Sequence, residues 1–308
     1  MRISIIVPVY NSAKYLDRCL GSVLAVLDGV KGEILAIDNK SSDNSLAILK
    51  KYAKKYPQIS VLQCATPGAA AVRNFGASKA RGEYIWFVDA DDEIDKTAVR
   101  KLLKKADDTG ADMVMMGMKR VYEDGAVNYL SAVNANDNGY KSRFVRYGMG
   151  PVQVMIRRKW WMSHGLKFRE GIIHEDMELM SSLILYTDKF ASIDEPLYIY
   201  YQNPGSVLHK ENFDAHIFDI FPALQGLYEK FREAGAEKKY APELEWFFIW
   251  NLLIDSAKDF AKFPEGRVGF QRSREMLSEY FPNWRKNKFL RQKPVRLQIR
   301  VRLNYRKK

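Results

Sequence analysis

Residues 84–92 read YIWFVDADD, an apolar run that ends in a cluster of carboxylates. The apolar run predicts a strand that is buried on both faces, as in a parallel sheet. Asp89, Asp91 and Asp92 then lie at the carboxyl end of the strand, where α/β sheets bind ligands. Asp89 and Asp91 are two residues apart, so both can address one site. Their oxygens suit Mg²⁺ or Mn²⁺; an acidic loop that caps the next helix is the alternative.

The sequence on both sides of this stretch alternates between short apolar runs and amphipathic segments. The predicted strands are a run that ends at Val9 and residues 33–38, 59–62, 84–88 and 112–118, and the predicted helices are residues 16–27, 46–53, 69–79 and 96–106. This alternation predicts an α/β fold with a mostly parallel central sheet and helices on both faces. Polar residues gather after three of the strands, so we expect one ligand site at that edge of the sheet.

The second half of the chain has a less regular pattern. Residues 123–150 are polar and contain glycine, which predicts a crossing loop or a change of subdomain. The patterns further on predict strands at 152–156 and 197–201, a helix at 176–186, and three helices between 214 and 280.

The formal charge of +12 is concentrated at the end of the chain. Residues 285–308 hold 11 basic residues, and no acidic residue follows Glu279. Apolar and mostly basic residues alternate from Val295 to Arg306, which favours an extended segment with one apolar and one basic face over an amphipathic helix. We expect this basic tail to meet an anionic membrane surface; nucleic acid and a solvated tail are the alternatives.

Several classes of protein are excluded by composition and motifs. Two cysteines give no disulfide framework and fit a reducing compartment, so we expect a cytoplasmic protein. The longest apolar stretch, residues 246–254, is too short to span a membrane. No glycine-rich dinucleotide loop or Walker lysine loop is present. The Asp-x-Asp motif differs from that of haloacid dehalogenase phosphatases, because Glu93 replaces their Thr or Val.

Six segments in this order resemble the family 2 glycosyltransferases. They are IIVPVYN at 5–11, AIDNKSSDNS at 36–45, VRNFG at 72–76, FVDADD at 87–92, HEDMEL at 174–179 and YQNPGSV at 201–207. The resemblance covers about residues 1–210. It implies a GT-A fold and an inverting, metal-dependent transfer from a nucleotide sugar to a hydroxyl of a glycan or lipid-linked glycan.

The resemblance also implies which residues bind the nucleotide sugar. They are Pro8, Tyr10, Asn11, Asp38, Arg73, Asp89 and Ala90. For Arg73, an ion pair with Asp38 or Asp89 is the alternative. Asn39 stands where the family usually has a second Asp, and Lys40 replaces a usual Gly. These two changes leave the nucleotide base open, with uridine the commonest choice in the family.

The remaining implied roles concern the metal and the chemistry. Asp91 would bind a Mn²⁺ or Mg²⁺ ion that bridges the diphosphate, with His209 as a further ligand or as a structural residue. Asp176 would be the general base and Glu175 its partner; ordinary carboxylates in a first helical turn are the alternative. Trp160, Trp161, Tyr200 and Tyr201 are candidates to stack on sugars.

We expect four parts along the chain. Residues 1–122 form the nucleotide-sugar-binding half and 123–210 the acceptor half of the GT-A domain, followed by a helical region at 211–284 and the basic tail at 285–308. The enzyme would act in cell-surface polysaccharide synthesis, peripheral to the inner face of the membrane. A sugar-nucleotide nucleotidyltransferase and a non-catalytic binding module are the alternative functions.

Overall fold

The computed structural model describes residues 1–203 and 212–307. The chain forms two compact units. Unit 1 comprises Met1–Tyr140, Met149–Gly171 and Tyr186–Ser206, and unit 2 comprises Lys141–Gly148, Ile172–Leu185 and Val207–Lys308.

Unit 1 is built on one mixed sheet. Its strands are β1 (Ile3–Val9), β2 (Gly32–Asp38), β3 (Ile59–Gln63), β4 (Tyr84–Phe87), β5 (Glu93–Ile94), β6 (Met113–Val121), β7 (Val127–Leu130), β8 (Val154–Arg157) and β9 (Phe190–Tyr201). The strand order is β3-β2-β1-β4-β8-β6-β9-β5, with β7 paired to β6. Strands β1 to β4 are parallel to one another, and β5, β7 and β8 run antiparallel to their neighbours.

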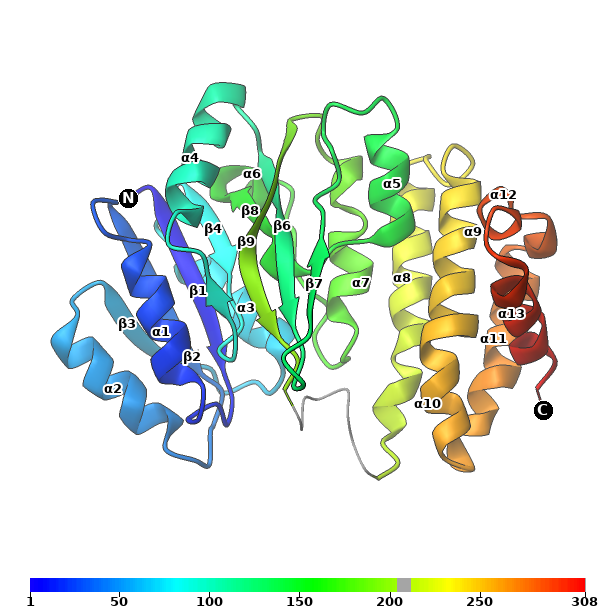
Figure 1. The fold of residues 1–308 in the computed structure, drawn as a ribbon, viewed down its shortest axis with the longest axis horizontal. Helices are drawn as coiled ribbons and strands as arrows, with labels where there is room; N and C mark the ends of the chain where they lie inside the picture. The colour runs from blue at the N-terminus through cyan, green and yellow to red at the C-terminus, as the bar shows by residue number, and fades with distance from the viewer. Residues whose placement is uncertain (204–211, 308) are drawn as a thin grey trace. The chain divides into compact units, whose positions relative to one another are not determined.

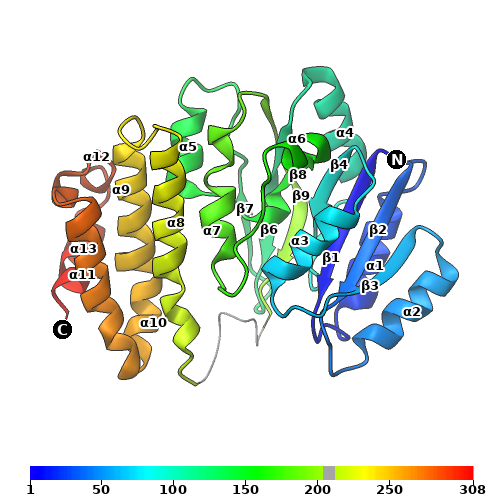
Figure 2. The same cartoon turned by 180° about the vertical axis from the view of Figure 1, so that it is seen from behind.

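Helices cover both faces of this sheet. They are α1 (Leu16–Ala25), α2 (Ser45–Lys55), α3 (Ala69–Lys79), α4 (Ala98–Thr109) and α6 (Arg158–Ser163). Helices α1 and α4 lie on one face (Figure 1), and α3 and α6 lie on the other (Figure 2). Alternate residues of β1, such as Ile3, Ile5 and Val7, are fully buried in the core with α1 and α4. The predicted α/β architecture is therefore confirmed.

Unit 2 is helical. Apart from the first residue of α5, it contains α5 (Tyr140–Tyr147), α7 (Glu175–Met180), α8 (Ile220–Glu233), α9 (Ala241–Trp250), α10 (Ser256–Lys262), α11 (Val268–Tyr280), α12 (Lys288–Arg291) and α13 (Val295–Arg306). A π-helical turn, η4 (Asn251–Asp255), joins α9 and α10 into one rod that lies beside α8 and α11 (Figure 1). These three rods match the three helices predicted between 214 and 280.

Two predictions of local structure are wrong. Residues 123–150 form β7 and α5 and not a crossing loop; the alternative, a change of subdomain, agrees with the passage from unit 1 to unit 2 at Lys141. The segment predicted to be extended forms α13, because its apolar residues alternate and therefore divide into two stripes of period four. Leu297, Val301 and Tyr305 face the unit, and Val295, Ile299 and Leu303 are exposed on the opposite side. Among the described residues, no helix is long and apolar enough to cross a membrane.

Candidate functional site

The carboxyl ends of β1 and β2 lie side by side, with Val9 paired to Asp38. Asp38 is 1% exposed, and its Oδ1 atom has no hydrogen-bond partner among the described residues. A buried acceptor without a donor costs about 1–3 kcal/mol, so an N–H group of a ligand would be stabilised here. Pro8 is the neighbour of Val9 on β1, and the ring of Tyr10 is 62% exposed and open to stacking. This pair of strand ends therefore suits a planar base with an N–H donor.

Asn39 has a structural task that the sequence does not reveal. Its Nδ2 atom donates to the carbonyl oxygens of Cys64 at 2.9 Å and Thr66 at 2.8 Å, and its Oδ1 accepts from the Gly68 amide at 2.9 Å. The carboxamide thus holds the loop that leads into α3. An aspartate has no side-chain N–H, so it cannot make the first two bonds.

Asn39→Asp is expected to lower the free energy of unfolding by about 2–4 kcal/mol, because two carbonyls lose their donor and face a carboxylate. Denaturant unfolding measures this loss. Asn128→Asp on exposed β7 makes the same chemical change on the surface and is the matched control. An equal loss in both variants would contradict the role assigned to Asn39.

The turn after β2 contains a lysine in a backbone conformation that favours glycine. Lys40 has a φ of 58°, and Asn11, which follows β1, has a φ of 48°. Asparagine tolerates this left-handed region, but a lysine is strained in it by about 1 kcal/mol. Asn11 also fixes the turn, since its Oδ1 accepts from the Ser42 amide at 2.8 Å. The usual family glycine would fit position 40 without strain.

Lys40→Gly is therefore expected to stabilise the protein by about 0.5–1 kcal/mol, or to be neutral after the extra entropy of the unfolded chain is included. The measurement is the midpoint of denaturant unfolding. Lys40→Ala keeps a Cβ atom and the strain, so it is expected to bring no gain. If Lys40→Ala stabilised the protein more than Lys40→Gly, the backbone at position 40 would not be strained.

The VRNFG segment on α3 connects the site to the sheet. Arg73 is 7% exposed, and its Nη2 donates to Asp89 Oδ1 at 3.0 Å. The ion pair with Asp89, which was the alternative for Arg73, is therefore present, and a contact of Arg73 with the nucleotide stays a prediction. Gly76 lies so close to β1 and β2 that a Cβ atom there would be 2.4 Å from Ile6 Cγ2 and 2.8 Å from Ile37 Cδ1. Glycine at this position lets α3 approach the strands and brings Arg73 to the acidic cluster.

The acidic strand end after β4 is held by residues that the sequence reasoning missed. The Tyr198 hydroxyl accepts from the Asp89 amide at 3.1 Å and donates to Asp92 Oδ2 at 2.6 Å. Burial, followed by the charges of Asp89 and Asp91, raises the pKa of Asp92 to about 8. Asp92 is a buried support beneath the site. Tyr198 carried no signal in the sequence, because it looks like any strand residue.

Asp91 points toward a different set of partners. Its Oδ2 accepts from Asn203 Nδ2 at 3.1 Å, and its carbonyl oxygen accepts from the Arg18 guanidinium. Burial and then the negative charge of Asp89 raise the pKa of Asp91. Asn203 lies within YQNPGSV, one of the six segments that resemble the family, but its residue type alone does not predict this hydrogen bond. Arg18 lies on the polar side of α1 and gave no signal.

The described residues offer only part of a coordination shell for a metal. Among them, no group of three or more His, Cys, Asp and Glu side chains is arranged to hold an ion. His209 lies outside the described residues. The carboxylates of Asp89 and Asp91 nevertheless fit Mg²⁺ or Mn²⁺, because these ions prefer oxygen and keep several positions for water or phosphate. Burial and then the charge of Asp89 raise the pKa of Asp91, and a bound cation would offset both effects on its carboxylate.

Glu175 and Asp176 begin α7 in unit 2 and are half-buried. His174 precedes them, and burial lowers its pKa although the nearby carboxylates, Asp176 foremost, raise it. His174 also lines a hollow of about 50 Å³ in unit 2 with Asp214, His216 and Asp259. The first turn of a helix favours carboxylates. The position of Asp176 is therefore compatible both with a general base and with an ordinary carboxylate in the first turn of a helix.

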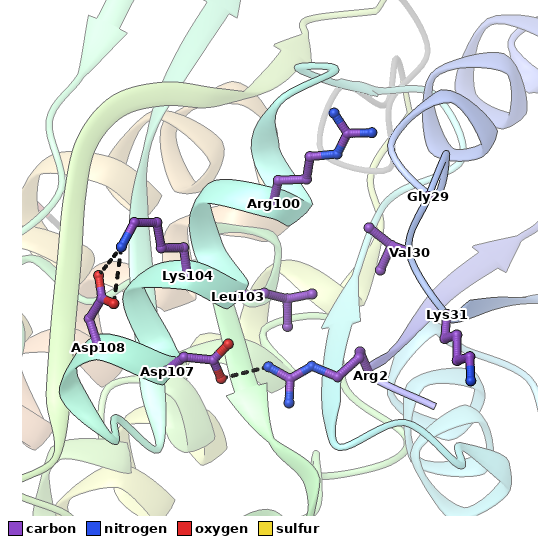
Figure 3. A pocket seen from close by; sticks show the side chains of 9 residues that line it. All are labelled: Arg2, Gly29, Val30, Lys31, Arg100, Leu103, Lys104, Asp107 and Asp108. Carbon is purple, nitrogen blue, oxygen red and sulfur yellow. Dashed lines mark hydrogen bonds and ion pairs between the residues drawn. The ribbon is translucent and has the colours of Figure 1, made fainter.

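A larger hollow, of about 520 Å³, lies at the opposite end of β1 from Asp38. Figure 3 shows two ion pairs among its charged side chains, Arg2 with Asp107 at 2.6 Å and Lys104 with Asp108 at 2.8 Å, while Lys31 and Arg100 form no pair with the other residues drawn. Because this hollow lies at the amino end of β1, away from the carboxyl ends of the parallel strands where such sheets bind ligands, we do not place the site here.

The aromatic candidates for sugar stacking are divided by burial. Trp160 and Trp161 are 7% and 2% exposed, and Trp161 packs on Phe87, so their predicted role in stacking is wrong. Tyr201 lies under the Arg18 guanidinium, with 3.6 Å between Arg18 Cζ and the ring centroid.

The family of the protein follows from comparison with known proteins. Residues 4–166, more than half of the chain, match the family model described as Glycosyl transferase family 2. The chain belongs to this family. This glycosyltransferase is 29% identical over 254 residues to EpsJ of Bacillus subtilis, described as an uncharacterized glycosyltransferase; the match covers 77% of this chain and 72% of EpsJ. It is 28% identical over 260 residues to the cholesterol galactosyltransferase of Borreliella burgdorferi, covering 75% and 72% of the two chains.

A solved structure confirms the fold of the glycosyltransferase. The crystal structure of residues 1–349 of Staphylococcus aureus TarS in complex with UDP-GlcNAc superposes with a TM-score of 0.78. It is 21% identical and covers 99% of this chain and 90% of that one. The predicted GT-A fold and the helical region that follows it are thus confirmed, and the family match confirms the assignment as a glycosyltransferase.

Proposed function

We propose that this enzyme transfers a sugar from a UDP-sugar, with inversion, to a hydroxyl of a glycan or lipid-linked glycan in cell-surface polysaccharide synthesis. The observation that carries the donor assignment is the buried Oδ1 of Asp38 without a partner among the described residues. Uracil and guanine present a ring N–H that a carboxylate accepts, whereas N3 of cytosine is an acceptor. The TarS complex with UDP-GlcNAc supports uracil as the base.

The other donor-binding residues follow from their positions around Asp38. Tyr10 stacks on the base, and Pro8 and Asn11 shape the end of β1 beneath it. Arg73 and Asp89 form an ion pair that faces the ribose and diphosphate. Ala90 is buried and small, which keeps the turn that contains Asp89, Asp91 and Asp92, the acidic turn, compact.

Asp91, with His209 from outside the described residues, would hold Mn²⁺ or Mg²⁺. A bound divalent ion would stabilise the charge that builds on the leaving diphosphate. A mannosyltransferase of Pyrobaculum calidifontis has a solved complex with GDP-Man and Mn²⁺, and it shares the fold at a TM-score of 0.53 and 15% identity. Asn203 orients the Asp91 carboxylate by its hydrogen bond to Oδ2.

The acceptor hydroxyl must lose its proton while its oxygen attacks the anomeric carbon of the donor. We assign the general base to Asp176, whose carboxylate takes up this proton, and we assign Glu175 to orienting the base or the acceptor. The bond from the anomeric carbon to the diphosphate oxygen breaks in the same step, and UDP leaves.

Relatives support an acceptor in the cell envelope. They include the cholesterol galactosyltransferase of Borreliella burgdorferi and the poly(ribitol-phosphate) beta-glucosyltransferase of Bacillus spizizenii, the latter 28% identical over 235 residues. We propose that the enzyme works at the inner face of the membrane, with residues 1–122 binding the donor, 123–210 binding the acceptor, and 211–284 and 285–308 forming the helical region and basic tail.

The test is calorimetric titration of the full chain with UDP, GDP, CMP and dTDP, with and without Mn²⁺. UDP is expected to bind best and only with Mn²⁺, and Asp38→Asn is expected to weaken UDP binding about tenfold or more by removing a charged acceptor. Asp28→Asn, at a side chain that is 90% exposed, is the matched control. Preferential binding of CMP, or no binding of any nucleotide, would overturn the donor assignment.

A further inference from the structure

One face of α13 is firmly attached to unit 2. Val301 is fully buried, and Asn304 Nδ2 donates to the Leu253 carbonyl oxygen at 2.8 Å. Leu253 lies in the π-helical turn η4, where the backbone pattern departs from that of an α-helix. The ring of Tyr305 packs on Trp284 with 4.9 Å between centroids. The orientation of α13 on unit 2 is therefore fixed by buried contacts.

The opposite face presents a stripe of large apolar side chains, which we call the α13 stripe. It consists of Val295, Ile299 and Leu303, which are 68%, 50% and 56% exposed. Successive members are four residues apart, so each step turns the helix by only about 40° and the three side chains form one line. Apolar side chains so placed on an anchored helix gain free energy when a non-aqueous surface covers them.

Arginines border this stripe. Arg296 and Arg300 lie along one side, Arg302 lies along the other, and Arg306 lies at its C-terminal end; all four are exposed. Within the described residues, none of them forms an ion pair with a carboxylate, and the sequence has no acidic residue after Glu279. The surface is thus apolar at its centre and strongly cationic at its border.

We propose that the α13 stripe and its arginines dock on an anionic lipid membrane. Long arginine side chains can reach headgroup phosphates while the apolar stripe enters the boundary of the acyl region. Nucleic acid would use the arginines but not the three apolar side chains, and a protein partner would need acidic groups in register with them. The inference extends the proposed membrane-side location, but its test measures binding and is independent of transferase activity.

The test is co-flotation of the full chain with vesicles of phosphatidylcholine alone and of phosphatidylcholine mixed with phosphatidylglycerol. Binding is expected only to the anionic vesicles and is expected to weaken with added salt. Arg296→Gln/Arg300→Gln is expected to weaken it about 25-fold, since each basic group near the surface contributes about fivefold. Val295→Ser/Ile299→Ser/Leu303→Ser is expected to weaken it at least about tenfold.

Lys50→Gln/Lys54→Gln on α2 in unit 1 removes two exposed charges elsewhere and is expected to leave binding nearly unchanged. Denaturant unfolding shows that each variant is folded, as expected for exposed positions. Absence of binding to anionic vesicles, equal losses from the α2 and α13 charge variants, or full binding by the serine variant would each overturn the proposal. A dimer that the serine variant dissociates, without vesicle binding, would assign the stripe to a second copy of the chain instead.

Discussion

Asp91→Asn is expected to reduce glycosyl transfer about 10³-fold or more and to abolish the Mn²⁺-dependent binding of UDP. In the structure Asn203 Nδ2 donates to Asp91 Oδ2 at 3.1 Å. The asparagine variant keeps an oxygen that can accept this hydrogen bond, so we expect the local fold to be retained. The substitution removes one of two neighbouring negative charges, and in the proposed site that charge would attract the divalent cation. The measurements are initial transfer rates and calorimetric titration of UDP with Mn²⁺.

The Asp28→Asn control changes net charge by the same amount far from the strand ends and is expected to leave both measurements unchanged. Unfolding curves of the Asp91 variant separate loss of function from loss of fold. If the variant still binds UDP in a Mn²⁺-dependent way, Asp91 is not the metal ligand.

Asp176→Asn is expected to lower kcat by about 10²–10⁴-fold while the affinity for UDP stays the same. The carboxamide retains the size of the side chain but cannot take up the proton of the acceptor hydroxyl. If Asp176 only stabilised the N-terminus of α7 by its interaction with the helix dipole, its replacement would lower the free energy of unfolding by about 0.3–1 kcal/mol and leave kcat unchanged. Steady-state kinetics with a saturating donor, together with calorimetric titration of UDP, distinguishes these roles.

Asp17→Asn is the matched control, because Asp17 is an exposed carboxylate in the first turn of α1. Its replacement is expected to affect stability slightly and kcat not at all. Equal effects of the two substitutions on kcat would remove Asp176 from the chemistry.

Local patterns predicted most of the fold because the elements of unit 1 are encoded by their own periodicity. The run at 84–88 is apolar throughout, and β4 is buried throughout. The tail shows the limit of this reasoning, since an alternating apolar pattern also supplies two opposite stripes on a helix. In the structure the helix is held by contacts of Asn304 with Leu253 and of Tyr305 with Trp284, and the local pattern of the tail does not show these contacts.

Site residues could be predicted where the residue type itself indicates the function. Residues that only hold a neighbouring side chain in place could not be predicted. Asp38 and Asp91 stood out because carboxylates at strand ends are conspicuous. Asn39 was read as a change at the nucleotide, but it braces the loop before α3. Asn203 and Tyr198 act through hydrogen bonds to acids more than a hundred residues earlier, and no local pattern marks such pairs.

The hydrogen bonds between Tyr198 and the turn at Asp89 and Asp92 also determine the order in which parts of the enzyme can fold during translation. Asp89 and Asp92 are synthesised early, but their supports, Tyr198 and Tyr201, follow 106 to 109 residues later. A nascent chain can form β1 to β4 on the ribosome while the acidic turn still lacks its braces. The acidic turn is therefore completed late in translation, when β9 emerges and pairs with β6.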